Sequence, residues 1–505
     1  MCVTYNFGIK ISFVTFFVNY SVAFLLLNDS RSNSFRSICP LNSAHIHLFF
    51  RYMYYAVTAL NENQTLSDKF HRLIVPLCLV PVLFICVSQF LHMDFLKFIL
   101  QKWNFDFIFP VGTVYGTFYN PNFVGSYVVL LFPVLVALFI AAQNWKSRML
   151  TGLLSVAILI ALAGSKSASG FLILGVAFVF FAIMQIKDKK TGLIFGGIIF
   201  AVIIAAIGFD FVTGNYYSSK IWASIHPSKT ERTLEKIETT DEDVEITYKG
   251  KQLNISFLYD ASSSDTFQFS FTDGQGESIS YEIESEGRIL ITEEDFSGIT
   301  VYPAYMTDMD DLLTFVVVID DKNWIFTNQT NGSYYYLNNY GHLDKIDNAP
   351  MTLFNGNPGF ASGRGFLWGK TIPLLKKCIF IGSGPDTYGF VYPQSDYVDK
   401  FYNGYENTYV TRPHNMYLQI AIQTGVLSLI CVLVFYGVYF VQSIRIYRKT
   451  RKGKLLWYVG YGIFIGTVGY MLVGFFNDST LTVAPIYWCL LGMGYAINKK
   501  VKDIN

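Results

Sequence analysis

Charged side chains are scarce in this sequence. Asp, Glu, Lys and Arg together make up 15% of the 505 residues, whereas hydrophobic residues make up 52%. Soluble globular domains carry about a quarter charged residues, so this balance excludes an ordinary soluble protein. The net charge is +1, and Lys and Arg occur in short clusters between apolar runs, so the chain also lacks the basic surface of a nucleic-acid-binding protein.

Cysteines with the spacing of a metal site or a disulfide framework are absent as well. The seven cysteines form no CxxC pair, and most lie in or beside apolar segments: Cys2, Cys39, Cys78, Cys86, Cys378, Cys431 and Cys489. Closely spaced thiols are typical of zinc sites, and regular cysteine patterns are typical of small secreted disulfide scaffolds. The sequence therefore predicts neither a zinc site nor a disulfide framework, and no motif in it indicates a cofactor.

Long apolar runs, in contrast, are abundant. A helix needs about 20 apolar residues to cross the hydrocarbon core of a bilayer. The predicted spans are residues 8–27, 44–60, 73–91, 122–142, 149–164, 168–186, 191–209, 415–441, 455–475 and 481–497. The span at 44–60 is either transmembrane or interfacial, because it contains two histidines and an arginine. The first run shows no small-residue cleavage site and is predicted to be a retained helix.

Clusters of basic residues next to these spans indicate the orientation of the chain. The clusters are Lys146 and Arg148, then residues 187–190, 445–454 and 499–502. Cytoplasmic loops of membrane proteins are enriched in Lys and Arg, so all four clusters are predicted to be cytoplasmic. Alternation then places four segments on the outer side of the membrane, namely residues 110–121, 164–168, 210–414 and 476–480.

A segment of different character lies within the longest outer segment, at residues 228–350. Hydropathy falls there, and apolar residues alternate with polar ones, which is typical of strands with one buried face. The alternating residues are Val244, Ile246 and Tyr248, then Phe267, Phe269 and Phe271 before an Asp273-Gly274 turn, with further strand-like runs at 278–283, 313–319, 324–327 and 334–337. We predict a small antiparallel β domain that serves either as a spacer or lid or as a binding module for glycan or a partner.

The predicted fold is therefore mainly α, a polytopic transmembrane helical bundle of about ten spans with an inserted extracytoplasmic β domain. Its four parts are N-terminal membrane helices at 1–227, the β insertion at 228–350, a membrane-proximal loop at 351–414 and C-terminal membrane helices at 415–505. The loop is polar and rich in glycine. Irregular backbone at the membrane is tolerated where protein covers it or where it lines a wet cavity, so we expect the loop to form the wall of a site.

His414 is the candidate base in this loop. It lies between a proline and the start of a predicted helix near Asn415. A neutral imidazole there can take a proton from a sugar hydroxyl. The alternative is a structural role, either as a helix cap or through a hydrogen bond, and an isolated histidine usually has such a role. Arg412 in the same RPHN motif is a candidate contact to the substrate.

Two further cations are predicted on the outer side. Arg364 lies between glycines in SGRGFLW, and a guanidinium there can hold two oxygens of a phosphate. Lys166 lies in a hairpin between two spans, on the side where positive charge is disfavoured. Either cation can instead anchor the chain to lipid headgroups. The two cations can stabilise the negative charge of a departing diphosphate, and His414 supplies the base.

Amide side chains occupy the outer end of a neighbouring span. Asn120 and Asn122 in GTFYNPNFVGSY can bind sugar hydroxyls or cap the helix. Asp386 in GSGPDTY is interpreted as a turn residue, and Asn477 and Asp478 in FFNDST fit a tight turn or a helix cap.

An ordered set of motifs resembles one known family. The set is GTFYNPNF, AGSKSASG, SGRGFLW, GSGPDTY, RPHNMYLQ followed by TGVLSL, and FFNDST. In this order the motifs resemble the O-antigen ligase and polymerase superfamily of bacterial membrane proteins, over residues from about 110 to the end but without the β insertion.

The resemblance implies a fold of the C-type glycosyltransferase kind and a metal-independent glycan transfer from an undecaprenyl-diphosphate-linked donor. It implies an envelope acceptor, a location in the cytoplasmic membrane and roles for Arg364 as the loop arginine and His414 as the base. Lys166 stands where the family usually has arginine, and lysine lacks the planar fork of a bidentate grip. The family also commonly has about twelve spans and no such β insertion in its minimal pattern.

Three functions stay open at this stage. The first is glycan transfer or polymerisation, in which Arg364 and Lys166 stabilise the diphosphate and His414 deprotonates the acceptor. The second is a carrier or flippase, although the spans between 122 and 209 contain few charges. The third is a membrane-anchored sensor that uses the β domain. The sequence does not distinguish a ligase from a polymerase, and it does not identify the sugar.

Overall fold

A computed structural model describes most of the chain after residue 117. The described residues are 118, 120–185, 193, 197, 200, 203–204, 207–227, 232–260, 266–284, 287–306, 312–449, 455–480 and 482–504. The predicted spans at 8–27, 44–60 and 73–91, and most of the span at 191–209, lie outside the described residues.

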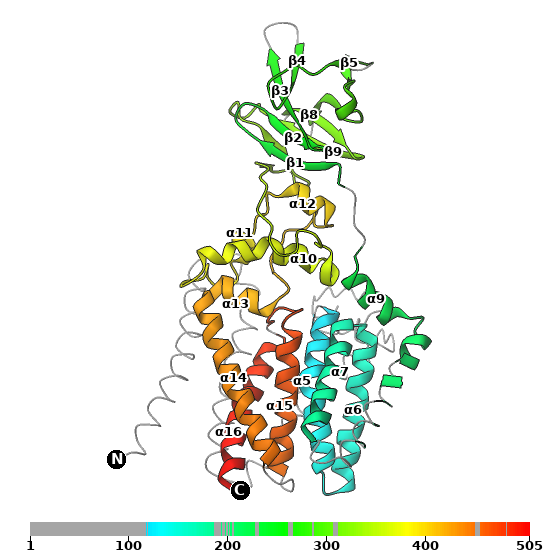
Figure 1. The fold of residues 1–505 in the computed structure, drawn as a ribbon, viewed down its shortest axis with the longest axis vertical. Coiled ribbons are helices and arrows are strands. Elements are labelled where there is room, and N and C mark those ends of the chain that lie inside the picture. Colours follow the sequence, from blue (N-terminus) through cyan, green and yellow to red (C-terminus); the bar gives the residue numbers. More distant parts are fainter. Residues whose placement is uncertain are drawn as a thin grey trace, which may run out of the picture. The chain divides into compact units, whose positions relative to one another are not determined.

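The chain divides into two compact units (Figure 1). The helical unit consists of Met1–Thr213 and Ile430–Asn505, and the mixed unit consists of Gly214–Leu429. The long helix α14 (Val426–Lys449) begins in the mixed unit and continues in the helical one.

Helices form in the helical unit where the sequence predicts spans. They are α5 (Pro121–Ala141), α6 (Trp145–Ser165), α7 (Ala168–Gln185), α15 (Leu455–Val473) and α16 (Ala484–Ile504). Among the described residues, four helices are long and apolar enough to cross a membrane, namely α5, α6, α14 and α15. The prediction of an integral membrane protein with transmembrane helices is thereby confirmed, whereas the number of about ten spans stays a prediction.

Helices α5 and α15 pack closely because α15 has glycines on the facing side. A Cβ atom on Gly462 would lie 2.8 Å from the carbonyl oxygen of Pro133, and one on Gly466 would clash with the carbonyl oxygen of Leu130. Small residues allow the backbones of membrane helices to approach closely, which increases van der Waals contact where no hydrophobic effect drives association. This pair forms the buried centre of the unit.

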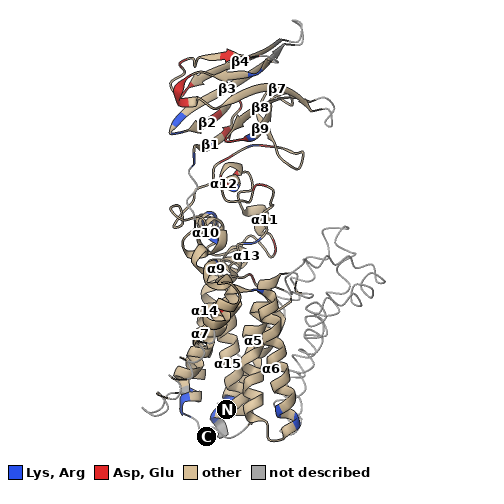
Figure 2. Ribbon diagram, turned by 90° about the vertical axis from the view of Figure 1, so that its right-hand side faces the viewer, with Lys and Arg blue, Asp and Glu red and all other residues tan. Residues whose placement is uncertain are grey.

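Most of the described Lys and Arg residues of the helical unit lie at one end of it (Figure 2), whereas Lys166 lies at the other end of α6. Helix α6 begins next to Lys146, α14 ends at Lys449, and Lys502 lies in the last turn of α16. The positive-inside rule states that the cytoplasmic ends of membrane helices are enriched in Lys and Arg. The assignment of this end to the cytoplasm stays a prediction.

One predicted span has the wrong boundaries. The sequence predicts a single helix over 415–441, but the chain forms α13 (Met416–Thr424) and then α14. Gly425 separates them with a φ of 105°, a conformation that side chains other than glycine rarely adopt. A Cβ atom there would also lie 2.9 Å from the carbonyl oxygen of Phe380, so the break accommodates a neighbouring segment.

The mixed unit contains two antiparallel sheets. Their strand orders are β1-β2-β3-β4 and β11-β10-β9-β8-β7-β6-β5. The strands are β1 (Leu234–Thr239), β2 (Val244–Tyr248), β3 (Lys251–Asp260), β4 (Thr266–Asp273), β5 (Tyr281–Ile283), β6 (Ile289–Ile291), β7 (Thr300–Met306), β8 (Leu312–Ile319), β9 (Lys322–Thr327), β10 (Tyr335–Leu337) and β11 (Leu343–Asp344). The predicted antiparallel β structure is confirmed, while its extracytoplasmic location stays a prediction.

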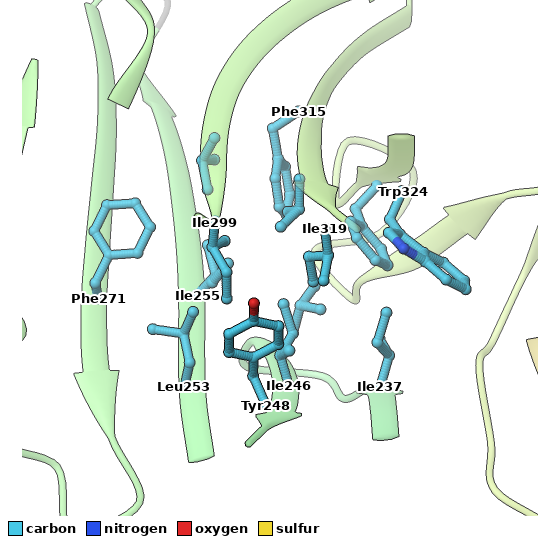
Figure 3. Close-up of a cluster of buried hydrophobic side chains, with 14 of the residues drawn as sticks. Ile237, Ile246, Tyr248, Leu253, Ile255, Phe271, Ile299, Phe315, Ile319 and Trp324 are labelled. Carbon is cyan, nitrogen blue, oxygen red and sulfur yellow. The ribbon is translucent and has the colours of Figure 1, made fainter. Parts of the chain in front are cut away.

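The alternating residues of β2 and β4 form one side of the sandwich core. Figure 3 shows Ile246 and Tyr248 of β2 together with Phe271 of β4, Phe315 of β8 and Trp324 of β9. The period of two places every second side chain on one face of a strand, which explains why these residues are buried.

The core also contains residues from outside the strands. Tyr397 and Val398 of the short helix α12 (Tyr397–Tyr402) are buried in the same cluster. Helix α12 follows the sandwich by about 50 residues in the chain and yet completes its core. The β sandwich and the segment after it are therefore packed as one body.

The remaining described helices of the mixed unit are α9 (Tyr216–Ile225), the 3₁₀ helix η3 (Glu294–Phe296), α10 (Phe360–Thr371), the 3₁₀ helix η5 (Ile372–Lys377) and α11 (Tyr388–Val391). Helix α10 contacts both α9 and η5.

Candidate functional site

Arg364 lies where an unusual turn becomes a regular helix. Ala361, Ser362 and Gly363 have φ angles of 52°, 62° and 85°, so three successive residues are left-handed at the start of α10. A non-glycine residue in this conformation costs about 1–2 kcal/mol, and such strain is concentrated at functional sites. The Nη1 atom of Arg364 donates a hydrogen bond of 2.8 Å to the carbonyl oxygen of Ala361. The turn thus holds the half-buried guanidinium in place.

Tyr405 lies beside the same turn. A Cβ atom on Gly363 would lie 3.3 Å from the hydroxyl oxygen of Tyr405, and the rings of Phe366 and Tyr405 are 5.5 Å apart. Burial raises the pKa of Tyr405, and the positive charge of Arg364 opposes this rise. A neutral phenol therefore accompanies the arginine. The sequence did not point to Tyr405, because a tyrosine in a polar loop has no distinctive pattern.

His414 is held by the residues on both sides of it. The indole Nε1 of Trp368 donates a buried hydrogen bond of 2.9 Å to the carbonyl oxygen of Pro413. The side chain of Asn415 caps α13 by accepting from the amide of Tyr417 at 2.9 Å. The helix cap is therefore Asn415 and not His414. His414 itself has a φ of 50° and is half-buried.

These contacts bring the segments of Arg364 and His414 together. Arg364 and Trp368 are four residues apart in α10, so they lie on the same side of the helix. The indole of Trp368 binds the residue that precedes His414. A single buried hydrogen bond thus connects the helix of the predicted phosphate-binding arginine to the backbone next to the predicted base. Arg412, two residues before His414, is exposed.

The other predicted site residues belong to the helical unit. The side chain of Asn120 caps α5 by accepting from the amide of Asn122 at 2.8 Å, so it has the capping role. The Oδ1 atom of Asn122 accepts a hydrogen bond of 3.2 Å from Ser167, the residue after Lys166. Lys166 is exposed and left-handed at the C-terminus of α6, with a φ of 53°.

Asn477, interpreted above as a turn residue, lies at the same place. Its amide donates hydrogen bonds to the carbonyl oxygen of Asn122 at 3.3 Å and to the hydroxyl of Ser126 at 3.0 Å. Four polar residues from three predicted motifs therefore meet at one end of the unit. Their convergence with Arg364 and His414 stays a prediction.

A buried network of charges was not anticipated from the sequence. Lys370 of α10 is 2% exposed, and its ammonium group contacts Asp396 and Asp399 at 2.5 Å each. It also donates to the carbonyl oxygen of Ala349 at 2.6 Å, which gives each of its three protons an acceptor. Arg232, just before β1, pairs with Asp399 at 2.6 Å. The network has two positive and two negative charges, so it is neutral as a whole.

This network joins the sandwich to the helix of Arg364. Arg232 and Ala349 lie at the two ends of the β segment, and both are tied through the network to α10. Burial raises the pKa of Asp396, and the neighbouring carboxylate of Asp399 raises it further, whereas Lys370 opposes the rise. The only signal in the sequence was a lysine within the apolar run FLWGKT, and that pattern does not identify partners about 25 residues away.

Among the residues that the structure describes, no group of three or more His, Cys, Asp or Glu side chains is arranged to hold a metal ion. The candidate side chains are Arg364, Tyr405 and His414 in the mixed unit, and Lys166 with the amides of Asn120, Asn122 and Asn477 in the helical unit.

Part of the chain matches a known protein family. Residues 313–433 match the family model described as O-Antigen ligase. No curated protein and no solved structure matches the chain. The matched range begins within β8 and ends within α14, so it contains Arg364, His414 and the Lys370 network except Arg232. It also extends into the sandwich, which the motif resemblance had left out. The match is confined to this range, and it supports the resemblance of the chain to the O-antigen ligase/polymerase superfamily.

Proposed function

We propose that this protein is a glycosyltransferase that joins or polymerises undecaprenyl-diphosphate-linked glycan at the outer face of the cytoplasmic membrane. The observation that carries the proposal is the buried hydrogen bond between Trp368 and Pro413, within the segment that matches the O-antigen ligase family. It connects the helix that carries Arg364, a cation that suits a diphosphate, to the backbone next to His414, whose imidazole suits a hydroxyl. The donor is a lipid-linked oligosaccharide, and the acceptor is a glycan or another envelope molecule.

The proposed step is a displacement at the anomeric carbon of the donor. His414 removes the proton of an acceptor hydroxyl while that oxygen attacks the carbon, and the bond between carbon and diphosphate oxygen breaks. The negative charge that develops on the diphosphate is stabilised by Arg364, with Lys166 as a second cation. Arg412, Asn120 and Asn122 bind the donor or the glycan. The proton ends on the imidazole, and the diphosphate leaves with the polyprenyl carrier.

Substitution of Arg364 tests the phosphate-binding role. In the purified full-length protein with an undecaprenyl-diphosphate-linked oligosaccharide, Arg364→Ala should lower kcat roughly 100-fold, because a donor to the developing charge is lost. Arg364→Lys should recover only part of the rate, since an ammonium lacks the planar fork.

Arg288→Ala provides the matched control, because Arg288 is exposed in the sandwich and contacts only the ring of Tyr302 among the described residues. Its rate should equal that of the wild type. Full transfer by Arg364→Ala at normal expression would remove Arg364 from the mechanism. Movement of the lipid-linked glycan into sealed vesicles without any joining would favour a flippase.

A further inference from the structure

An exposed apolar tip follows two lysines in the mixed unit. Lys376 and Lys377 end η5 and are exposed. After the buried Cys378, the side chains of Ile379, Phe380 and Ile381 are 49%, 79% and 81% exposed. Three successive large apolar side chains on a surface mark a contact with a partner or a membrane.

The tip is attached to the first turn of a candidate membrane span. The amide of Val426 donates to the carbonyl oxygen of Cys378 at 2.9 Å, and the amide of Leu427 donates to that of Ile379 at 3.1 Å. Leu427 begins the exposed apolar face of α14, which continues along the helix. The apolar surface of the tip is therefore continuous with the first turn of α14, which is a candidate membrane span.

The segment after the tip is also fixed. The amide of Ser383 donates to the carbonyl oxygen of Ile422 at 2.8 Å, and the amide of Gly384 donates to that of Gln423 at 3.1 Å. Gly382 is so close to the backbone of Gln423 that a Cβ atom would clash with it. The tip is thus held from both sides, by α13 and by the start of α14.

We propose that residues 376–381 form an interfacial membrane anchor whose partner is the lipid bilayer. Ile379, Phe380 and Ile381 insert among the acyl chains, and the two lysines bind the phosphates of anionic headgroups. The continuity with α14 favours lipid over a protein partner, because α14 is itself a candidate membrane span whose apolar surface would contact lipid. The anchor fixes the depth of α13 in the membrane and hence the depth of His414, which precedes α13. It does not depend on the proposed glycan transfer.

The test places an environment-sensitive fluorescent amino acid at position 380 of the full-length protein in nanodiscs whose lipids carry brominated acyl chains. Bromine quenches only a probe that contacts the chains, so we expect about a twofold or greater loss of fluorescence. The same amino acid replaces Leu433 on the exposed face of α14 as the positive control, and Tyr305 of β7 as the aqueous control. Quenching at 380 should resemble that at 433 and exceed that at 305.

Two results would overturn the anchor. Red-shifted emission without quenching would show that the tip is in water, and blue-shifted emission without quenching would show that protein covers it. The lysines are tested by Lys376→Gln with Lys377→Gln. Anionic phosphatidylglycerol should increase quenching at 380 relative to phosphatidylcholine in the parent protein and not in the double variant. An equal increase in both would exclude the headgroup contact, and no outcome depends on a glycan substrate.

Discussion

Among single residues, Trp368 has the most direct effect on the candidate site. Its indole connects α10 to the backbone beside His414. Trp368→Phe keeps the ring in the core but removes the donor, so the buried carbonyl of Pro413 loses a partner. We expect a loss of about 1–3 kcal/mol in the free energy of unfolding and roughly a tenfold loss of transfer. Thermal unfolding in detergent and single-turnover transfer measure the two effects.

Trp222→Phe is the matched control, because Trp222 is 66% exposed and stacks only on His226 among the described residues. It should change neither quantity. If Trp368→Phe lowers stability but leaves transfer unchanged, the hydrogen bond is structural only.

Lys370 is the residue on which the buried charge network depends. Lys370→Met leaves the carboxylates of Asp396 and Asp399 without their common partner in a buried place. Removal of one member of a buried ion pair costs about 3–5 kcal/mol, so this variant should be strongly destabilised. Thermal unfolding of the purified protein measures the effect.

The combination Lys370→Met with Asp396→Asn removes one charge of each sign and leaves the ion pair of Arg232 and Asp399 in place. It should recover most of the lost stability, because no buried charge then lacks a partner. A double variant as unstable as Lys370→Met would show that the network acts through its hydrogen-bond geometry and not through its charge.

Among the elements, α15 shows how the sequence encodes close packing in the membrane. Gly466→Ala should separate α15 from α5, because the new methyl group would clash with the carbonyl oxygen of Leu130. We expect a loss of about 1–3 kcal/mol. Gly492→Ala in α16 is the control, since no atom lies within 4 Å of the added carbon apart from those of the two adjacent residues and of the nearby backbone of α16. It should be neutral or stabilising, and equal losses in both variants would contradict the packing argument.

The short helix α12 belongs to the sandwich core, so the strands cannot be removed without disturbing it. Deletion of residues 228–350 would be the simplest experiment to distinguish a sensor from a transferase. The structure shows that Tyr397 and Val398 of α12 complete the sandwich core, so this deletion would expose them. Substitutions on the exposed surface of the sandwich avoid this loss of core packing.

For the whole molecule, hydropathy and alternation predicted the elements well. Strands β2, β4, β8, β9 and β10 and helices α5, α6, α7 and α15 form where the periodicity placed them. The short strands β6 and β11 were not predicted. Strands β1, β3 and β7 and the break at Gly425 were not predicted either. Their lengths and positions depend on pairing with β2 and β8 and on the segment around Phe380, which lie elsewhere in the chain.

The sequence predicted two candidate side chains of the site but not the tertiary contacts that hold them in place. Arg364 and His414 stand in recognisable motifs, and the family match covers both. The indole of Trp368, the phenol of Tyr405 and the ammonium of Lys370 carry no signal in the sequence, because their roles come from tertiary contacts with residues 20 or more positions away. Such contacts are specified by packing and not by local pattern.

The most direct test of the proposed function is transfer from an undecaprenyl-diphosphate-linked oligosaccharide by the purified protein in the presence of EDTA. Wild type is compared with His414→Ala, and with His342→Ala as a control at an exposed histidine of the sandwich. Wild type and control should form product, and His414→Ala should be about 10²- to 10⁴-fold slower, because the base is lost. Equal rates for His414→Ala and wild type would contradict the assignment of His414 as the base that activates the acceptor.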